Sequence, residues 1–368
     1  MTGITLTGAY GGFNLGDEAT LRAVATLFGE GDGGIEDVIV FSRNANAILD
    51  EHTRSGLVFS DFANLLRTIP LVMRSNLLVG GGGFVQGRGL LWPFSYISLL
   101  IVANRLAGRR PVVLGIGADR PTHAISRCLF RHFFGLAAVI TCRDAHTASV
   151  VEALGIPRAK IRVTADFAFA LPPPTATRDR APGQRLRALV VPGRDRKYMA
   201  PSTAAMQSVL RHLTAGVDTG PEVIVMPHDL RDDYDLGEIA RICADIPRDR
   251  VTIVIPRTLS EALDLYRSAD FVVSNRLHPL ILAAVHGAVP VAAAYSTTKV
   301  RALVDALDLP SLGEPAGTSA RLAMLDELTA ERIASLRRAL APRVDAMRER
   351  ARSNRELARQ AWGESPAG

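Results

Sequence analysis

Arg276 and His278 are the residues whose types and position most clearly indicate chemistry in this chain. They follow a short apolar run, Phe271 to Val273, which is typical of a buried parallel strand. Pro279 then suits the first turn of a helix, which we expect over Leu280 to His286. In open α/β sheets, ligands bind at the carboxyl ends of strands, and the amino end of a helix favours anions. The pattern predicts an anion site, although an arginine and a histidine that only fix the turn fit it too.

A polar loop follows the first expected strand, Ile4 to Ala9. Its glycines have neither the spacing of a dinucleotide fingerprint nor the Gly-Lys-Ser/Thr of a Walker loop. Asn14, Asp17 and Glu18 are candidate contacts to a polar substrate, with one carboxylate as the acceptor of a hydroxyl proton. The simpler interpretation of the two acids is that they complement the dipole of the next helix. Both interpretations stay open.

Four consecutive glycines, Gly80 to Gly83, follow the expected strand Asn76 to Val79. Such a run destabilises a folded chain unless the backbone must pass close to something. We interpret it as a ligand-facing loop, and a tight interdomain contact is the alternative. The candidate ligand contacts are Gly81, Gly82, Gly83 and Gln86. The Gln86 amide can donate to and accept from a sugar hydroxyl, but a solvated glutamine fits the sequence equally well.

Other cations and histidines also follow expected strands. Arg143 comes after Val139 to Cys142 and is either an anion ligand or the partner of an acid. Lys299 lies one strand beyond Arg276 and is either a second cation for the same anion or a solvated lysine at a helix start. His228 ends a strand in the second half, where a single histidine is more often structural. No metal-ligand pattern is evident, so we expect no metal and no cofactor.

The elements that position these residues form two series of alternating strands and helices. The first runs from Ile4 to Leu154, and the second starts at Ala188, after the proline-rich segment Pro172 to Gly183. Strands rich in Val, Ile and Leu in βαβα order predict parallel, doubly wound sheets. We therefore expect an α/β protein with two Rossmann-like domains facing across a cleft, at 1–175 and 176–328. A basic C-terminal helix and tail, 329–368, would follow them.

Composition narrows the class of protein and its compartment. Hydrophobic residues make up 48% of the chain and charged residues 22%, which is typical of a globular protein. Three widely spaced cysteines form no disulfide framework, and no signal peptide is evident, so a cytoplasmic location is expected. The apolar run Leu90 to Ala103 is too short to span a bilayer. A low aromatic content of 6% and the lack of an RNA-binding motif argue against nucleic acid as a partner.

The net charge of +6 is concentrated near the C-terminus, where Glu331 to Gln360 carries nine arginines against four acids. Such a segment is attracted to an anionic membrane face or an acidic partner. The solvated face of a terminal helix is the favoured alternative.

Seven motifs follow one another along the chain: Gly11 to Ala19, Val79 to Gly83, Gly115 to Gly117, Arg143-Asp144, Thr164 to Phe169, Ser274 to His278 and Lys299 to Arg301. In type and order, over most of the chain, they resemble those of the polysaccharide pyruvyl transferase family. The serine that the family usually carries after its Arg-Asp pair is not clearly placed here, and His146 in that segment has no assigned role.

The resemblance implies a GT-B-like fold and a phosphoenolpyruvate-dependent pyruvyltransferase. Such an enzyme moves the pyruvyl unit of phosphoenolpyruvate onto two hydroxyls of one sugar, forms a ketal and releases phosphate. The expected acceptor is a sugar in a polysaccharide, a glycolipid or a cell-wall precursor. A lipid-linked acceptor would bring the enzyme into peripheral contact with the inner membrane face.

With this donor, His278 is the expected acid that protonates the methylene carbon, and Asp17 is the candidate base. Arg276, Arg143 and Lys299 are the expected cations for the phosphate and the carboxylate, because the arginine fork matches both groups. Two other functions fit the residues. One is a GT-B glycosyltransferase with a nucleotide-sugar donor, and the other is a non-catalytic binding module.

Overall fold

The computed structural model divides the chain into two compact units. Unit 1 contains Met1–Gly12, Asp17–Leu171 and Met347–Gly368, and unit 2 contains Phe13–Gly16 and Pro172–Ala346. The sequence prediction sets a boundary after residue 175 and separates 329–368, whereas here the C-terminal residues belong to both units. The structure describes residues 3–8, 10–29, 38–42, 58–61, 65–82, 94–118, 123–174, 184–193, 199–216, 220–231 and 235–363.

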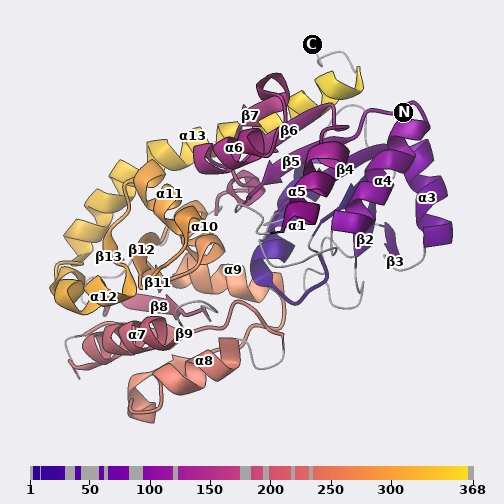
Figure 1. Ribbon diagram of the computed structural model, residues 1–368. Helices are drawn as coiled ribbons and strands as arrows, with labels where there is room; N and C mark the ends of the chain where they lie inside the picture. The colour runs from indigo at the N-terminus through magenta and orange to yellow at the C-terminus, as the bar shows by residue number, and fades with distance from the viewer. Residues whose placement is uncertain are drawn as a thin grey trace. The chain divides into compact units, whose positions relative to one another are not determined.

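Unit 1 is built on a seven-stranded parallel sheet with the order β3-β2-β1-β4-β5-β6-β7 (Figure 1). Strands β1, β4, β5 and β6 are buried along their whole length, which explains their continuous apolar sequences. The strands are β1 Ile4–Thr7, β2 Val38–Ser42, β3 Val58–Asp61, β4 Asn76–Gly80, β5 Val112–Ile116, β6 Val139–Cys142 and β7 Ile161–Val163.

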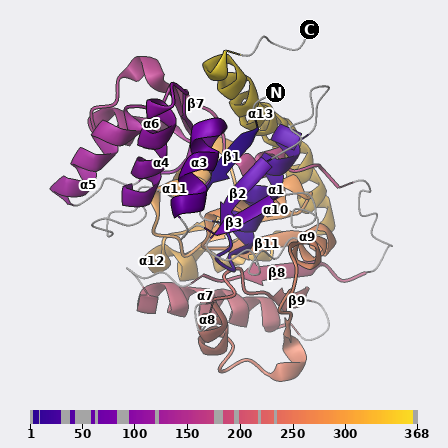
Figure 2. The same cartoon turned by 90° about the vertical axis from the view of Figure 1, so that its right-hand side faces the viewer.

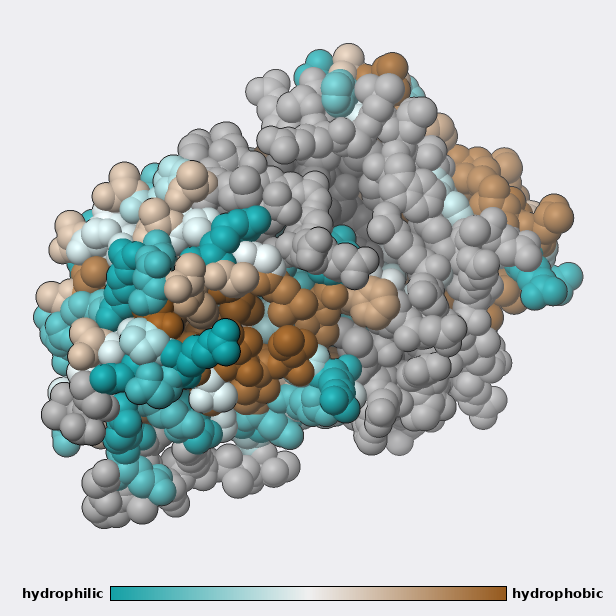
Figure 3. Space-filling view, turned by 90° about the horizontal axis from the view of Figure 1, so that it is seen from below, coloured by the Kyte–Doolittle hydropathy of each residue, from teal (hydrophilic) through white to brown (hydrophobic). Residues whose placement is uncertain are grey.

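The helices of unit 1 include α3 and α4, which pack against each other. Hydrophobic residues remain at the surface on the side of the molecule where α3 and α4 lie (Figures 1 and 3). The helices are α1 Leu15–Gly29, α3 Leu65–Arg74, α4 Phe94–Leu106, α5 Ala124–Leu129 with the π-helical turn Phe130–Phe134, and α6 Ala145–Ala153.

Unit 2 is built on a six-stranded parallel sheet with the order β10-β9-β8-β11-β12-β13. Helices α7 and α8 lie on one side of this sheet, and α9 and α10 lie on the other (Figures 1 and 2). The strands are β8 Arg187–Val191, β9 Glu222–Val225, β10 Thr252–Ile253, β11 Phe271–Ser274, β12 Val289–Ala293 and β13 Ser311–Gly313. The helices are α7 Met199–Thr214, α8 Asp235–Ile242, α9 Leu259–Ser268, α10 Leu277–Val285, α11 Thr298–Leu307 and α12 Pro315–Thr318.

The two sheets share one winding pattern, although the sequence shows no repeat. In each sheet the first strand lies between the second strand and the fourth. The chain therefore adds strands first on one side of this strand and then on the other, and the strand order reverses beside it. This switch point is between β1 and β4 in unit 1 and between β8 and β11 in unit 2. Loops at such points form the ligand crevice of doubly wound sheets. The predicted α/β class with two doubly wound, Rossmann-like domains is confirmed.

The basic C-terminal segment forms the long helix α13, Ala330–Trp362. Some of its arginine side chains bind groups of the two units and so hold the helix in place. In unit 2, Arg343 pairs with Asp308 at 3.0 Å. In unit 1, Arg350 donates to the carbonyl oxygen of Thr164 at 2.6 Å, and Asn354 accepts the Thr164 hydroxyl at 3.0 Å. Neither α13 nor any other helix of the described residues combines the length and apolar character needed to cross a membrane.

Candidate functional site

The predicted anion site lies at the amino end of α10, directly after β11. Arg276 is the N-cap residue of α10 and has an extended backbone, with φ −115° and ψ 152°, while His278 lies in the first turn. Ser274 accepts the Arg276 N–H at 3.1 Å and donates its hydroxyl to the carbonyl oxygen of Val191 at 2.7 Å. The connection between strand and helix is therefore tied to β8, and the helix begins three residues before the predicted Leu280.

Asn275 joins this connection to the loop after β8. Its side-chain oxygen accepts the Gly193 N–H at 2.8 Å, and its amide nitrogen donates to the Gly193 carbonyl at 2.8 Å. A Cβ atom added at Gly193 would lie 2.1 Å from Cδ of Arg276, so only glycine leaves room for the arginine. In the Ser-Asn-Arg-Leu-His motif, the first two residues therefore anchor the segment that presents Arg276 and His278.

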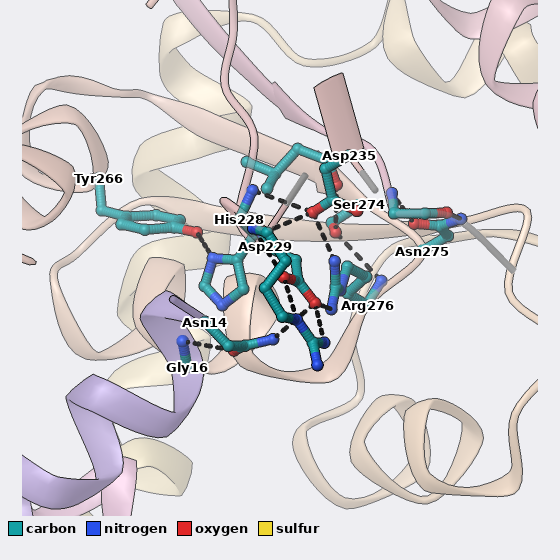
Figure 4. A network of polar contacts seen from close by, with 12 residues as sticks. Asn14, Gly16, His228, Asp229, Asp235, Tyr266, Ser274, Asn275 and Arg276 are labelled. Atoms are coloured by element: carbon teal, nitrogen blue, oxygen red, sulfur yellow. Dashed lines mark hydrogen bonds and ion pairs between the residues drawn. The ribbon is translucent and has the colours of Figure 1, made fainter. Parts of the chain in front are cut away.

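Two carboxylates of unit 2 position the guanidinium of Arg276 (Figure 4). Its Nη1 lies 2.5 Å from Oδ2 of Asp235, and its Nη2 lies 3.8 Å from Oδ2 of Asp229. Asp235 is fully buried at the start of α8, and the same oxygen accepts the backbone N–H groups of His228 and Asp229 at 3.1 and 2.7 Å. The Arg276 side chain is 26% exposed, and a guanidinium has five N–H donors, so it can still bind an anion.

Asp229 is also bound by Arg231, which donates from Nε at 2.7 Å. Burial alone would raise the pKa of Asp229, but the hydrogen bond from Arg231 and the charges of Arg231 and Arg276 lower it below its ordinary 3.8. The carboxylates of Asp229 and Asp235 therefore orient two arginines, Arg231 and Arg276.

His228 lies beside His278 as a buried imidazole. It is 1% exposed, its Nδ1 lies 3.3 Å from the hydroxyl oxygen of Tyr266, and its Nε2 has no hydrogen-bond partner among the described residues. The two imidazole rings stack with centroids 6.4 Å apart. Burial, followed by the charges of Arg276 and His278, lowers the pKa of His228 well below its ordinary 6.5. His228 is therefore neutral in the folded protein at neutral pH.

This neutral histidine predicts a specific dependence of stability on pH. A lowered pKa means that below pH 6.5 the unfolded chain binds a proton that the folded chain excludes. As the pH decreases below 6.5, this group alone should then lower the free energy of unfolding by about 1.4 kcal/mol for each pH unit. We expect His228→Asn to remove this component between about pH 5 and 6.5, where Asp229 stays ionised. Urea unfolding of both proteins across this range measures it, and parallel slopes would contradict it.

Residues Phe13–Gly16 belong to unit 2 through backbone hydrogen bonds to the loop after β9. Leu15 donates to the carbonyl of His228 at 3.0 Å, and Leu230 donates to the carbonyl of Phe13 at 2.8 Å. Phe13 has a left-handed backbone with φ 56°, which is uncommon for an aromatic residue. The chain thus turns sharply to place the next residues beside His228.

Asn14 and Gly16 complete the surroundings of His278. Asn14 is buried, its side chain accepts the Gly16 N–H at 2.9 Å and it donates to Asp229 at 3.4 Å. A Cβ atom added at Gly16 would lie 2.2 Å from Nδ1 of His278. Gly16 therefore makes room for the imidazole, while the predicted contact of Asn14 with an acceptor stays a prediction.

The other acids predicted at the start of α1 lie in unit 1. Glu18 is fully buried and accepts the backbone N–H of Gly11 at 3.2 Å. Asp17 is half-buried in the first turn of the helix. Glu18 thus stabilises the loop before α1, and a contact of Asp17 or Glu18 with an acceptor stays a prediction.

The glycine run after β4 has a local reason in the packing of unit 1. Gly81 and Gly82 have φ of 70° and 92°, which favour glycine. A Cβ atom at Gly81 would lie 2.3 Å from Cγ2 of Thr20 in α1. Gly83 and Gln86, the remaining residues predicted in this loop, lie outside the described residues.

Arg143 in unit 1 has acidic partners. It is 9% exposed, and its Nη1 lies 3.1 Å from Oδ2 of Asp166, with Asp144 at 3.6 Å from Nε. Of the two interpretations of Arg143, the structure shows the ion pair, and anion binding stays a prediction.

For two further residues of the sequence prediction, Lys299 and His146, the structure shows the position but does not define a role. Lys299 is half-buried in the first turn of α11, directly after β12, the strand beside β11. His146 is exposed on α6 and nothing in the structure explains it. Among the described residues, no group of three or more His, Cys, Asp or Glu side chains is arranged to hold a metal ion.

Four residues around Arg276 and His278 lack an assigned role in the sequence prediction: His228, Asp229, Asp235 and Tyr266. The first two were detectable in part, because Met226 to Asp229 follows a strand. Asp235 and Tyr266 begin or lie within ordinary helices, and no local signal marks them.

A model of the polysaccharide pyruvyl transferase family matches residues 14–297, well over half of the chain. The chain belongs to the polysaccharide pyruvyl transferase family. The matched region begins at Asn14, includes Arg276 and His278, and ends just before Lys299. No curated protein sequence matches this pyruvyl transferase family member.

Solved structures share its fold over nearly the whole chain. A putative UDP-N-acetylglucosamine 2-epimerase from Listeria monocytogenes has a TM-score of 0.66 at 13% identity and covers 99% of this chain and 98% of its own. The UDP-GlcNAc 2-epimerase from Neisseria meningitidis bound to UDP-GlcNAc has a TM-score of 0.61 at 11% identity, covering 98% and 99%. The lipopolysaccharide outer core galactosyltransferase WaaB, in its apo form, has a TM-score of 0.56 at 11% identity, covering 97% and 99%. These similarities confirm the GT-B-like fold.

Proposed function

We propose that the protein transfers the pyruvyl unit of phosphoenolpyruvate to two hydroxyls of one sugar, in a polysaccharide, glycolipid or cell-wall precursor. The product is a pyruvate ketal, and phosphate is released. The observation that supports this most is the pairing of Arg276 and His278 at the amino end of α10, at the switch point of unit 2, in a chain of this family.

Donor binding is assigned to the cations and to the helix terminus. Arg276 is held at one edge by Asp235, so its fork has a fixed orientation toward a phosphate or carboxylate. The amino end of α10 adds favourable dipoles, and Lys299 follows the neighbouring strand as a second cation. Arg143 contributes only if its pair with Asp166 rearranges.

In the proposed reaction His278 gives its proton to the methylene carbon of phosphoenolpyruvate. The phosphate dianion beside the ring favours the imidazolium, and neutral His228 next to it adds no competing charge. The adjacent carbon becomes electrophilic, the first hydroxyl adds, and the second displaces phosphate. Of the two hydroxyl protons, one restores His278 and the other leaves with phosphate. Asp17 is the candidate base for a hydroxyl.

A glycosyltransferase that uses a nucleotide-sugar donor is the second candidate function. Its support is the fold, which is similar to that of an epimerase bound to UDP-GlcNAc and of a galactosyltransferase. The same fold hosts different chemistries, so the site residues decide between them.

One assay separates the two functions. The protein is incubated with phosphoenolpyruvate and a panel of free, polymeric and lipid-linked sugars, and in parallel with nucleotide sugars and the same panel. We expect acceptor-dependent phosphate release and a ketal methyl signal by NMR in the first set. Turnover only in the nucleotide-sugar set would reject the proposal, and phosphoenolpyruvate binding without turnover would favour a binding module.

Gly16→Ala is expected to lower kcat/KM for ketal formation by about 100-fold, because its new methyl group displaces the His278 ring. Alanine favours a helix, so the protein should stay folded. The matched control is Gly29→Ala at the other end of α1, where an added Cβ meets nothing within 4 Å. Steady-state kinetics and thermal melts of both variants measure the effect. Equal activities of the two variants would contradict this role of Gly16.

A further inference from the structure

A long segment of unit 1 is free of acidic residues. From Phe62 to Ala118 the sequence has six arginines and no aspartate or glutamate. This segment includes α3 and α4, which pack against each other. The proposed chemistry uses neither helix, so their charge bias needs another explanation.

The same two helices expose large apolar side chains. Leu66 is 88% exposed and Leu106 is 80% exposed, while Leu65, Met73 and Leu99 are 37–39% exposed. In contrast, Thr68 and Val72 on α3 are completely buried. Hydrophobic surface is visible along the right-hand edge in Figure 3, the side on which Figure 1 draws α3 and α4. Apolar side chains gathered in this way typically mark an interaction surface.

Arginines lie in the last turn of both helices, next to Met73 and Leu106 in the sequence, and Arg105 and Arg109 donate to backbone carbonyl groups. Arg109 donates to the carbonyl oxygen of Arg74 at 3.0 Å, and Arg105 donates to the carbonyl oxygen of Arg109 at 2.9 Å. None of these three forms an ion pair with a carboxylate in the described part of the chain. These contacts hold the guanidinium groups of Arg105 and Arg109 at the carboxyl ends of the two helices, where Arg74 adds a third positive charge. Such a set of charges attracts anions, and a partner that brings several anionic groups would be favoured most.

We propose that this α3–α4 surface, made of Leu65, Leu66, Met73, Leu99, Leu106, Arg74, Arg105 and Arg109, docks on a bilayer of anionic phospholipids. The exposed apolar side chains enter the boundary of the headgroups, and the arginines bind lipid phosphates. A second copy of the chain fits less well, because a two-fold contact through this surface would bring two sets of arginines together. The proposal differs from docking through α13, whose Arg343 and Arg350 have partners within their own units.

Vesicle flotation with the full chain tests the proposal. We expect the protein to float with phosphatidylcholine vesicles that contain phosphatidylglycerol, to stay unbound with phosphatidylcholine alone, and to release at high salt. Leu66→Ser/Leu106→Ser should weaken binding more than tenfold. Arg105→Gln/Arg109→Gln should weaken it about thirtyfold, from roughly 1 kcal/mol for each arginine near the surface.

Two matched controls should leave vesicle binding unchanged. Arg332→Gln/Arg338→Gln removes the same charge from exposed positions of α13. Ile253→Ser/Ile255→Ser removes apolar side chains of unit 2 that are 48% and 52% exposed. A loss of binding in the α13 variant, equal binding to both vesicle types, or a dimer in light scattering that the Leu66→Ser/Leu106→Ser change dissociates would overturn the proposal. Turnover of a soluble acceptor should be unchanged in all variants, so the docking and the chemistry are tested separately.

Discussion

Replacement of His278 by glutamine is expected to lower kcat/KM for ketal formation by about three orders of magnitude. An amide cannot deliver a proton to the methylene carbon of phosphoenolpyruvate, whereas an imidazolium can. Arg276 and its anchors Asp235 and Ser274 are untouched, so the affinity for phosphoenolpyruvate should change only a few-fold. Steady-state kinetics and calorimetric titration with phosphoenolpyruvate measure both quantities.

The control for this variant is His146→Gln, which changes an exposed histidine on α6 of unit 1. We expect it to retain the activity and the stability of the unmodified protein. Turnover of His278→Gln close to that of this control would rule out His278 as the acid. Loss of phosphoenolpyruvate affinity without loss of kcat would instead make His278 a donor ligand.

Replacement of Asp235 by alanine is expected to lower the free energy of unfolding of unit 2 by about 3–5 kcal/mol. The change removes a buried acceptor and leaves the guanidinium of Arg276 and the backbone N–H groups of His228 and Asp229 without it. Asp235→Asn should cost less, because its amide oxygen can still accept the two N–H groups. Urea unfolding followed by circular dichroism measures these differences.

Asp245→Ala is the matched control in the same unit. Asp245 is 61% exposed and pairs with Arg211 at 2.6 Å, and such surface pairs contribute less than about 1 kcal/mol. If Asp235→Ala destabilises the protein no more than this control does, Asp235 does not organise the site. In that case the orientation of Arg276 must depend on other contacts.

Local sequence patterns were sufficient to predict the architecture and to place Arg276 and His278 between a buried strand and a helix. Apolar runs such as Phe271 to Val273, separated by helical segments, indicated parallel strands, and such strands are buried in the structure. Polar residues after a parallel strand lie at its carboxyl end, so the position of Arg276 and His278 could be predicted without coordinates, and their role in binding or catalysis stays a prediction. The interpretation of Arg143 stayed open, since local spacing does not distinguish an anion ligand from the partner of Asp166.

The surroundings of the site were beyond local patterns, because their contacts join distant parts of the chain. Asp235 is 41 residues from Arg276, and Asn14 is 215 residues from Asp229. The purpose of Gly16 is likewise invisible until His278 is placed against it. The glycine run after β4 suggested a ligand, whereas Gly81 already has a packing partner in Thr20. A need for close backbone approach is readable from sequence, but the group that approaches is not.

The proposed protonation of phosphoenolpyruvate is tested most directly by running the reaction in deuterium oxide and analysing the product by NMR. The acceptor is whichever sugar the assay with phosphoenolpyruvate identifies. If an exchangeable acid such as His278 protonates the methylene carbon, the ketal methyl group must carry one deuterium, and the same product should be nearly absent with His278→Gln. A product that retains an intact methylene group, or a methyl group without deuterium, would contradict the proposed chemistry.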